Sequence, residues 1–194
     1  MVSAIDRRDA VANLLEKRGD ALVVTGLGSP TYDVHAAGDH EGNYYLWGAM
    51  GGAALVGLGL AQAQPDRPVW VVTGDGEQLM AMGALATIGV AAPRNLSVIV
   101  LDNQHFGETG MQGSHTGAGV SLAGVAAACG WSETREIDDQ AEIDALASEL
   151  TDRAKGPRLY VVKVKAENLP RSMPSRDAVH IKNRFRAHLG FEPN

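Results

Sequence analysis

The chain has 194 residues, of which 45% are hydrophobic and 21% are charged, and these proportions suit a soluble globular protein able to bury its own core. The formal net charge of -6 argues against general affinity for nucleic acid. We expect a single domain over residues 1–194, with residues 165–194 as a basic C-terminal extension. From Thr151 onward there are ten Lys and Arg against four Asp and Glu. This basic end is expected to be solvated or to meet an acidic surface of a partner chain.

Targeting signals and disulfides are not expected. The first twenty residues lack the apolar segment of a signal peptide. The apolar run from Leu46 to Ala63 contains five glycines, so we interpret it as a buried helix and not as a membrane span. Cys129 is the only cysteine, which favours a reducing, cytoplasmic location. A small core residue is expected there rather than a catalytic thiol.

Helices and strands alternate in the first part of the chain. The spacing of apolar residues predicts a helix over 6–18, followed by a short buried strand over 21–25. That strand runs into Gly26-Leu27-Gly28-Ser29-Pro30, after which we expect a loop with two His and two Asp. A glycine-rich helix from about Trp47 leads to the next strand, over 69–73.

The alternation continues to the end of the chain. The expected elements are a helix over 77–92, a strand over 96–101, a helix over 121–129, an outer strand over 131–137, an acidic helix over 138–154, a last strand over 158–164 and a short helix over 177–189. Such a pattern indicates an α/β fold of three layers, in which a parallel sheet has helices on both faces. Ligands in such folds bind at the carboxyl ends of the strands.

Common nucleotide-binding motifs are absent. No Gly-Lys pair exists, so there is no Walker A loop. The stretches GLGSPT, GLGLAQ and GDGEQL each lack the third glycine of a dinucleotide fingerprint. A nicotinamide-type cofactor is therefore disfavoured.

Two polar clusters follow two successive strands instead. Gly74-Asp75-Gly76 opens a helix whose N–H groups can face a diphosphate, and Asp75 adds a carboxylate beside it. Asn103 follows the next strand, after the 26 residues 77–102. Mg²⁺ prefers oxygen ligands shared with substrate phosphates, so the two clusters together predict a Mg²⁺-diphosphate site.

This spacing resembles the diphosphate-binding motif of thiamine diphosphate enzymes. By that resemblance Asp75, the Asn103 side chain and the backbone carbonyl of His105 bind the metal. Gly48-Ala49-Met50-Gly51 is similar to the family's G-x-M-G segment, in which a backbone carbonyl holds the aminopyrimidine and the methionine supports the bent cofactor. A methionine on a core helix is the alternative interpretation of Met50.

The wider resemblance is to the β subunit of sulfopyruvate decarboxylase and the corresponding half of phosphonopyruvate decarboxylase. The matching segments are NYYLWGAMGGAALVGLGLA, GDGEQLMAMGALATIG, NLSVIVLDNQHFGETGMQGSHT and IKNRFRAHLG. The resemblance implies a thiamine diphosphate-binding fold with cofactor contacts at Gly28, Ser29, Gly48, Ala49, Met50, Gly74, Asp75, Gly76, Glu77, Asn103, His105, Phe106 and Gly107. Two positions depart from the pattern: Glu77 stands where this subfamily often has a small hydroxyl residue, and Gln104 stands where many relatives have a second Asn.

The implied activity is thiamine diphosphate- and Mg²⁺-dependent decarboxylation of an anionic 2-oxo acid, such as sulfopyruvate or phosphonopyruvate, to an aldehyde and CO₂. In this family a glutamate that activates the pyrimidine ring lies in a separate domain, so a partner α subunit and an α₂β₂ or larger assembly are expected. The alternatives are a carboligase or synthase subunit, an oxidative 2-oxo acid enzyme, or a non-catalytic subunit that binds thiamine diphosphate. No nucleic acid or membrane partner is expected.

Histidines are the candidates for substrate contacts. His115 lies on the long loop after Asn103, and we expect it either to contact substrate or relay a proton, or to be an exposed loop residue. His40 is a second candidate for a catalytic role.

Overall fold

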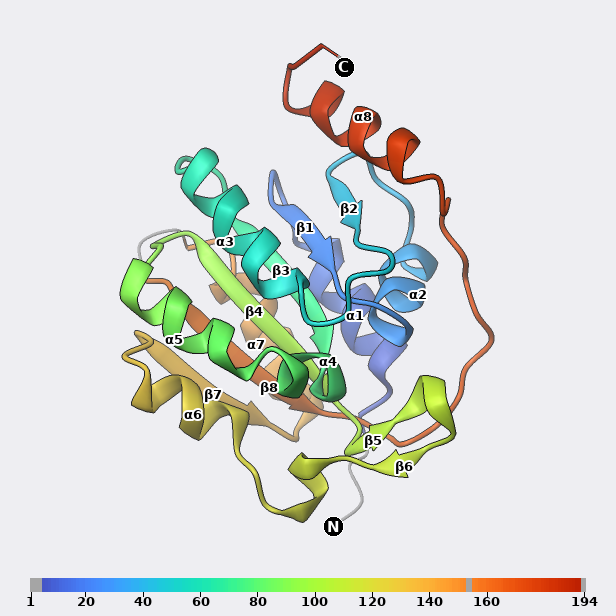
Figure 1. Cartoon of the computed structure of the whole chain (residues 1–194), viewed down its shortest axis with the longest axis vertical. Helices are drawn as coiled ribbons and strands as arrows, with labels where there is room; N and C mark the ends of the chain where they lie inside the picture. The colour runs from blue at the N-terminus through green and yellow to red at the C-terminus, as the bar shows by residue number, and fades with distance from the viewer. Residues whose placement is uncertain (1–4, 153–154, 193–194) are drawn as a thin grey trace.

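A six-stranded sheet forms the centre of the computed structural model, which describes residues 5–152 and 155–192 (Figure 1). The strands lie in the order β2 (Asn43–Tyr45), β1 (Leu22–Thr25), β3 (Val69–Gly74), β4 (Leu96–Asp102), β8 (Arg158–Lys163) and β7 (Glu133–Ile137). Every neighbouring pair is parallel. The predicted parallel sheet is confirmed.

Helices cover both faces of this sheet. The helices on one face are α1 (Arg7–Glu16), α2 (Ser29–Ala36) and α7 (Gln140–Glu149), and those on the other are α3 (Ala53–Ala63), α5 (Met82–Ala91) and α6 (Leu122–Ala128) (Figure 1). Successive strand residues face opposite cores, so that Ile99 packs in one core while Val98 and Val100 pack in the other. Continuous apolar strands such as β4 are needed for a sheet buried on both sides. The three-layer α/β fold is thus confirmed.

The order of the strands creates a crevice at the carboxyl ends of the strands. From β1 the chain crosses to the edge strand β2 and then returns to β3 on the other side of β1. Ligands of open α/β sheets bind at such a reversal, outside the carboxyl ends of the strands. The loop that begins at Gly26 follows β1, and Asp75 follows β3, so the fold brings both to this crevice.

Two predicted helices have different bounds in the structure. The helix expected from Trp47 begins only at Ala53, because Gly48 and Gly51 have φ angles of 73° and 88°, which form a turn and not a helix. The helix expected over 77–92 is divided at Ala81 into α4 (Asp75–Met80) and α5. None of the helices in the described part of the chain has the length and apolar character that crossing a membrane requires.

Two segments that were expected as loops contain regular structure. The stretch after Pro30 holds α2 and β2, and a proline in the first turn of α2 is favourable because it has no N–H to leave unpaired. The stretch after Asn103 forms a hairpin and two short 3₁₀ helices. These elements are β5 (His105–Phe106), η1 (Gly107–Thr109), β6 (Gln112–Gly113) and η2 (His115–Ala118).

The basic C-terminal segment is part of the packed domain. After β8 the chain runs along the side of the sheet to α8 (Ala178–His188), which packs beside β2 (Figure 1). Phe185 is buried with its ring centre 5.5 Å from that of Tyr44. Arg184 pairs with Asp39, with 2.6 Å between Nη1 and Oδ2. The apolar face of α8 therefore covers the edge of the sheet, while its basic residues Lys182, Arg184 and Arg186 remain partly exposed.

We expect Phe185→Ala to lower the free energy of unfolding by about 3–5 kcal/mol, because the change leaves a cavity between α8 and β2. Phe191→Ala is the matched control, since that ring is 49% exposed, and its effect should stay within about 0.5 kcal/mol. Denaturant titration of both variants measures the difference. Equal, small effects would show that α8 adds nothing to the stability of the domain.

Candidate functional site

A cavity of about 190 Å³ lies at the carboxyl ends of β1, β3 and β4. The predicted site residues in its lining are Ser29, Met50, Gly74, Asp75, Gly76, Glu77, Asn103, His105, Phe106 and Gly107. Gly28, Gly48 and Ala49 belong to the adjoining turns and do not line it. The structure therefore brings most of the predicted residues to one place, although they come from four separate segments.

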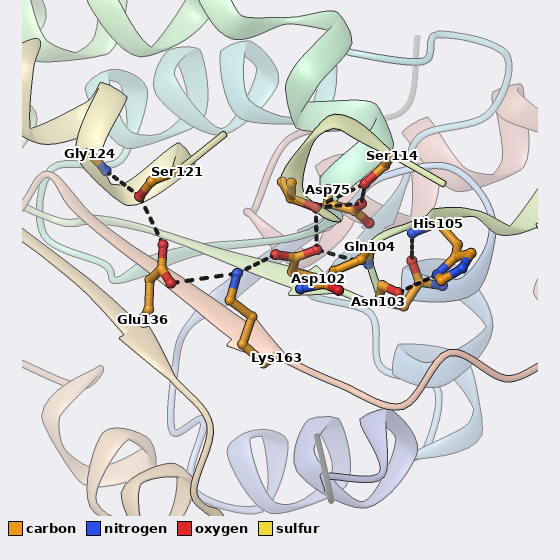
Figure 2. Close-up of polar contacts among 11 residues, drawn as sticks. Asp75, Asp102, Asn103, Gln104, His105, Ser114, Ser121, Gly124, Glu136 and Lys163 are labelled. Atoms are coloured by element: carbon orange, nitrogen blue, oxygen red, sulfur yellow. Dashed lines mark hydrogen bonds and ion pairs between the residues drawn. The ribbon is translucent and has the colours of Figure 1, made fainter. Parts of the chain in front are cut away.

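Asp75 is the first residue of α4 and follows β3 directly. Its side chain is buried, and Oδ2 accepts a hydrogen bond from Ser114 Oγ at 2.5 Å (Figure 2). Thr116 Oγ1 lies 3.3 Å from the same oxygen. Burial raises the pKa of Asp75 to about 6, and the hydrogen bond from Ser114 opposes that rise. The carboxylate is thus held from one side by a hydroxyl group of the segment that follows β6.

Asn103 lies just beyond β4, at the start of a tight turn. Its Oδ1 accepts a hydrogen bond from His105 N at 2.9 Å, and His105 Nδ1 lies 2.8 Å from the Asn103 carbonyl oxygen (Figure 2). Gln104 lies between them and has a φ of 61°. This value is in the left-handed region, which is uncommon for residues other than Gly, Asn and Asp. This turn leads the chain from β4 into β5 and keeps Asn103 and His105 adjacent.

Hard oxygen donors make up this part of the site. They are the Asp75 carboxylate and the Asn103 side-chain oxygen, and His105 lines the same cavity. Within residues 5–152 and 155–192, no three His, Cys, Asp or Glu side chains lie together as a metal-binding group. Mg²⁺ in phosphate sites commonly takes one or two carboxylates, with phosphates and water as its other ligands. The donors present fit that ion together with a bound diphosphate.

Glu77 is buried, and its carboxylate is directed toward the surrounding loops. Oε2 accepts from Leu27 N at 2.8 Å and Thr73 Oγ1 at 3.0 Å, while Oε1 accepts from Gly51 N at 3.1 Å. A Cβ atom at Gly26 would lie only 1.8 Å from Glu77 Oε2, so glycine is required there. Glu77 therefore ties the loop after β1 and the turn before α3 to the start of α4. A small hydroxyl residue at this position could not make all three contacts.

Phe106 closes the space between the hairpin and α4. Its ring packs against Gly76, where an added Cβ would lie 2.7 Å from Phe106 Cδ1. A second cavity, of about 310 Å³, lies beyond this ring and shares Met50, Gly76 and Phe106 with the first. Met50 is in the turn before α3, 42% exposed, and so it is not a residue of a core helix. It stands between the two cavities.

The two predicted histidines have different positions. His115 lines the second cavity, with its ring centre 6.2 Å from that of Phe106. His40 precedes β2, and because β2 is parallel to β1 its start lies at the opposite edge of the sheet from Asp75. There His40 Nδ1 accepts from Gly42 N, and the ring lies 5.5 Å from that of His188. His40 therefore lines neither cavity, and it is not part of the proposed site.

Three residues of this region were not identified from the sequence. Ser114 donates to Asp75 and Thr116 donates to Asp102, and the two residues flank His115. Arg7 lines the first cavity and is buried, with Nε donating to Asp33 Oδ2 at 2.7 Å. Arg7 precedes Ala10, Val11 and Leu14 at helical spacing, so periodicity alone would have placed it on the buried face of α1.

Comparison with known proteins identifies the class of this domain. Residues 28–164, more than half of the chain, match the family described as thiamine pyrophosphate enzyme, C-terminal TPP binding domain. The chain therefore belongs to this family of thiamine pyrophosphate-binding domains. The matched range contains Asp75 and Asn103.

Several individual proteins are similar to this chain over most of its length. Phosphonopyruvate decarboxylase of Streptomyces viridochromogenes is 40% identical over 93% of this chain, and the β subunit of sulfopyruvate decarboxylase of Methanothermobacter thermautotrophicus is 34% identical over 95%. The chain spans 45% of the length of the first protein and 94% of the second. It spans 66% of the corresponding β subunit of Methanocaldococcus jannaschii, at 38% identity.

Solved structures share the fold. The chain superimposes on a putative thiamin diphosphate-dependent enzyme from Mycobacterium smegmatis with a TM-score of 0.72 and 19% identity, over 85% of this chain and 33% of that one. Benzoylformate decarboxylase from Polynucleobacter necessarius gives a TM-score of 0.65 at 16% identity, over 86% of this chain and 34% of that one. The α/β thiamine diphosphate-binding fold predicted from the sequence is thus confirmed.

We expect Glu77→Gln to lower the free energy of unfolding by about 1–3 kcal/mol, because either orientation of the new amide turns an NH₂ group toward a buried backbone N–H. Glu108→Gln, at a partly exposed carboxylate paired with Arg171, is the control and should cost less than about 1 kcal/mol. Thermal and chemical denaturation compare the two. Similar losses in both variants would mean that the Glu77 carboxylate does not hold the loops.

Proposed function

We propose that this chain is the diphosphate-binding (β) subunit of a thiamine diphosphate- and Mg²⁺-dependent decarboxylase that acts on an anionic 2-oxo acid. The observation that carries the proposal is the position of Asp75 and Asn103, which follow the neighbouring strands β3 and β4 and line one cavity in a thiamine pyrophosphate-binding domain. The names of the relatives, phosphonopyruvate decarboxylase and sulfopyruvate decarboxylase subunit β, support a sulfopyruvate- or phosphonopyruvate-like substrate, an aldehyde product and release of CO₂.

The proposed roles follow from the donors at the site. Asp75, the Asn103 side chain and the backbone carbonyl of His105 hold Mg²⁺, and backbone N–H groups at the start of α4 face the diphosphate. Met50, between the two cavities, supports the body of the cofactor. Thiamine diphosphate, when bound, supplies the electron sink that allows a 2-oxo acid to lose CO₂. The chain contributes binding, orientation and the exclusion of water.

The second cavity is the proposed place of the substrate. His115 and Met50 both line it, together with the apolar side chains Leu79 and Val120. His115 would contact the substrate or relay a proton to the product, which imidazole can do near neutral pH. Apolar walls favour loss of CO₂, because the localised negative charge of the substrate carboxylate becomes dispersed as CO₂ leaves.

A partner α subunit is proposed to supply the glutamate that activates the pyrimidine ring. The support is the alignment of this chain with 94% of a protein named as subunit β. The active site would then form between the two chains, in an α₂β₂ or larger assembly.

We expect Asp75→Ala to weaken the Mg²⁺-dependent binding of thiamine diphosphate by more than about 100-fold, since even changes outside the ligand shell of metal sites cost about 10- to 100-fold. Isothermal titration with thiamine diphosphate at fixed Mg²⁺ measures this, using the chain together with its α subunit. Asp144→Ala, which removes a surface carboxylate of α7, is the control and should bind as the wild type does. Unchanged binding in Asp75→Ala would refute the proposed metal site.

Co-expression with the candidate α subunit, followed by assays of CO₂ release from sulfopyruvate, phosphonopyruvate and pyruvate, tests the reaction. We expect the pair to release CO₂ and aldehyde from one of the two anionic substrates more efficiently than from pyruvate, and this chain alone to release neither. Full turnover by this chain alone would contradict the partner. A carboligation product would contradict the decarboxylase in favour of a synthase.

A further inference from the structure

A buried carboxylate lies directly behind the proposed metal ligands. Asp102 is the last residue of β4, its side chain is fully buried, and it lines neither cavity. Burying a carboxylate is unfavourable unless it is paired and hydrogen-bonded. The hydrogen-bond and ion-pair partners of Asp102 therefore explain how its buried carboxylate is stabilised.

One oxygen of Asp102 is neutralised from the neighbouring strand. Lys163 of β8 is in register with Asp102, and its Nζ lies 2.7 Å from Asp102 Oδ2. The same ammonium lies 3.5 Å from Glu136 Oε2 on β7 (Figure 2). Ion pairs between β4, β8 and β7 thus fix the position of the Asp102 side chain.

The other oxygen contacts the turn that carries Asn103 and His105, and the segment after β6 that holds Asp75. Asp102 Oδ1 accepts from Gln104 N at 3.0 Å, which closes the turn around Asn103 (Figure 2). It also accepts from Thr116 Oγ1 at 2.7 Å. Thr116 Oγ1 also lies 3.3 Å from Asp75 Oδ2, so this hydroxyl is close to both carboxylates.

The number of hydroxyl hydrogens decides which of these contacts are hydrogen bonds. Ser114 and Thr116 carry one hydroxyl hydrogen each. The short contacts place the Ser114 hydrogen on Asp75 and the Thr116 hydrogen on Asp102, while the two hydroxyl oxygens lie 2.9 Å apart. Each hydroxyl therefore holds one carboxylate, and their shared segment fixes the separation of Asp75 from the end of β4.

We propose that Asp102, anchored by Lys163, is a positioning residue that sets the distance between Asp75 and Asn103 through Thr116 and the Gln104 turn. The inference rests on the proposed function, because it concerns the geometry of the proposed metal site. Mg²⁺ demands near-ideal octahedral geometry, whereas Ca²⁺ accepts longer and more variable distances. A change in this spacing should therefore weaken Mg²⁺ binding more than Ca²⁺ binding.

The test compares Thr116→Val, which keeps the shape of the side chain but removes its hydroxyl, with Thr116→Ser, which keeps the hydroxyl. Asp102→Asn is the second disruptive variant. The apparent dissociation constants of Mg²⁺ and of Ca²⁺ are measured by titration calorimetry on the assembled protein, at one fixed concentration of thiamine diphosphate for all variants. Ser132→Ala is the matched control, because that hydroxyl donates to Gly156 O at the far edge of the sheet.

We expect Thr116→Val and Asp102→Asn to weaken Mg²⁺ binding by about 10- to 100-fold, as changes behind metal ligands commonly do, and Ca²⁺ binding by clearly less. Thr116→Ser should restore Mg²⁺ affinity to within about threefold of the wild type, and Ser132→Ala should leave both constants unchanged.

Two outcomes overturn the inference while leaving the proposed function in place. One is wild-type Mg²⁺ affinity in both disruptive variants when Asp75→Ala has lost it. The other is an equal loss of Mg²⁺ and Ca²⁺ binding accompanied by a lower unfolding free energy, which is the signature of general structural support. Failure of the wild-type assembly to bind Mg²⁺ with thiamine diphosphate would instead refute the proposed function itself.

Discussion

The parallel pairing of β3 with β4 is the constraint on which the candidate site depends. In that register Gly74 is opposite Leu101, so Asp75 and Asn103 both lie just beyond the last paired residues of adjacent strands. A shift of one residue would turn the side chains of a strand to the opposite face of the sheet. The mostly apolar sequences of β3 and β4, packed on both faces, oppose such a shift. The core thereby fixes where the two proposed metal ligands lie.

Buried charges then secure the loops that surround the strand ends. Glu77 accepts hydrogen bonds from the loop after β1 and from the turn before α3, and Asp102 does the same for the turn after β4. Arg7, paired with Asp33, supports the opposite side of the first cavity. Loops supported by a rigid sheet can present several ligands to one small molecule, which is the usual design of α/β binding sites.

The fold could be predicted from the sequence, and the proposed metal ligands follow from the same strong local signals, although their role stays a prediction. Continuous apolar runs indicate buried strands, and the spacing from Asp75 to Asn103 is that of two polar clusters one βαβ unit apart. The helix α2 was not predicted, since its buried face includes polar side chains such as Thr31 and Asp33. The start of α3 was placed too early because the composition of residues 47–52 does not reveal the left-handed glycines of the turn. The contacts of Thr116 with Asp75 and Asp102 join residues 41 and 14 positions apart, and such pairs have no local signature. His40 was considered for its residue type alone, and only the strand order places it at the other edge of the sheet.

The most direct test of the account is the crystal structure of the assembled protein with thiamine diphosphate and Mn²⁺ in place of Mg²⁺, using the anomalous signal of the metal. The account predicts one anomalous peak within coordinating distance of an Asp75 carboxylate oxygen, the Asn103 side-chain oxygen and the His105 carbonyl, with the remaining ligands from the diphosphate and water. A metal bound to other residues, or a diphosphate bound away from the start of α4, would contradict it.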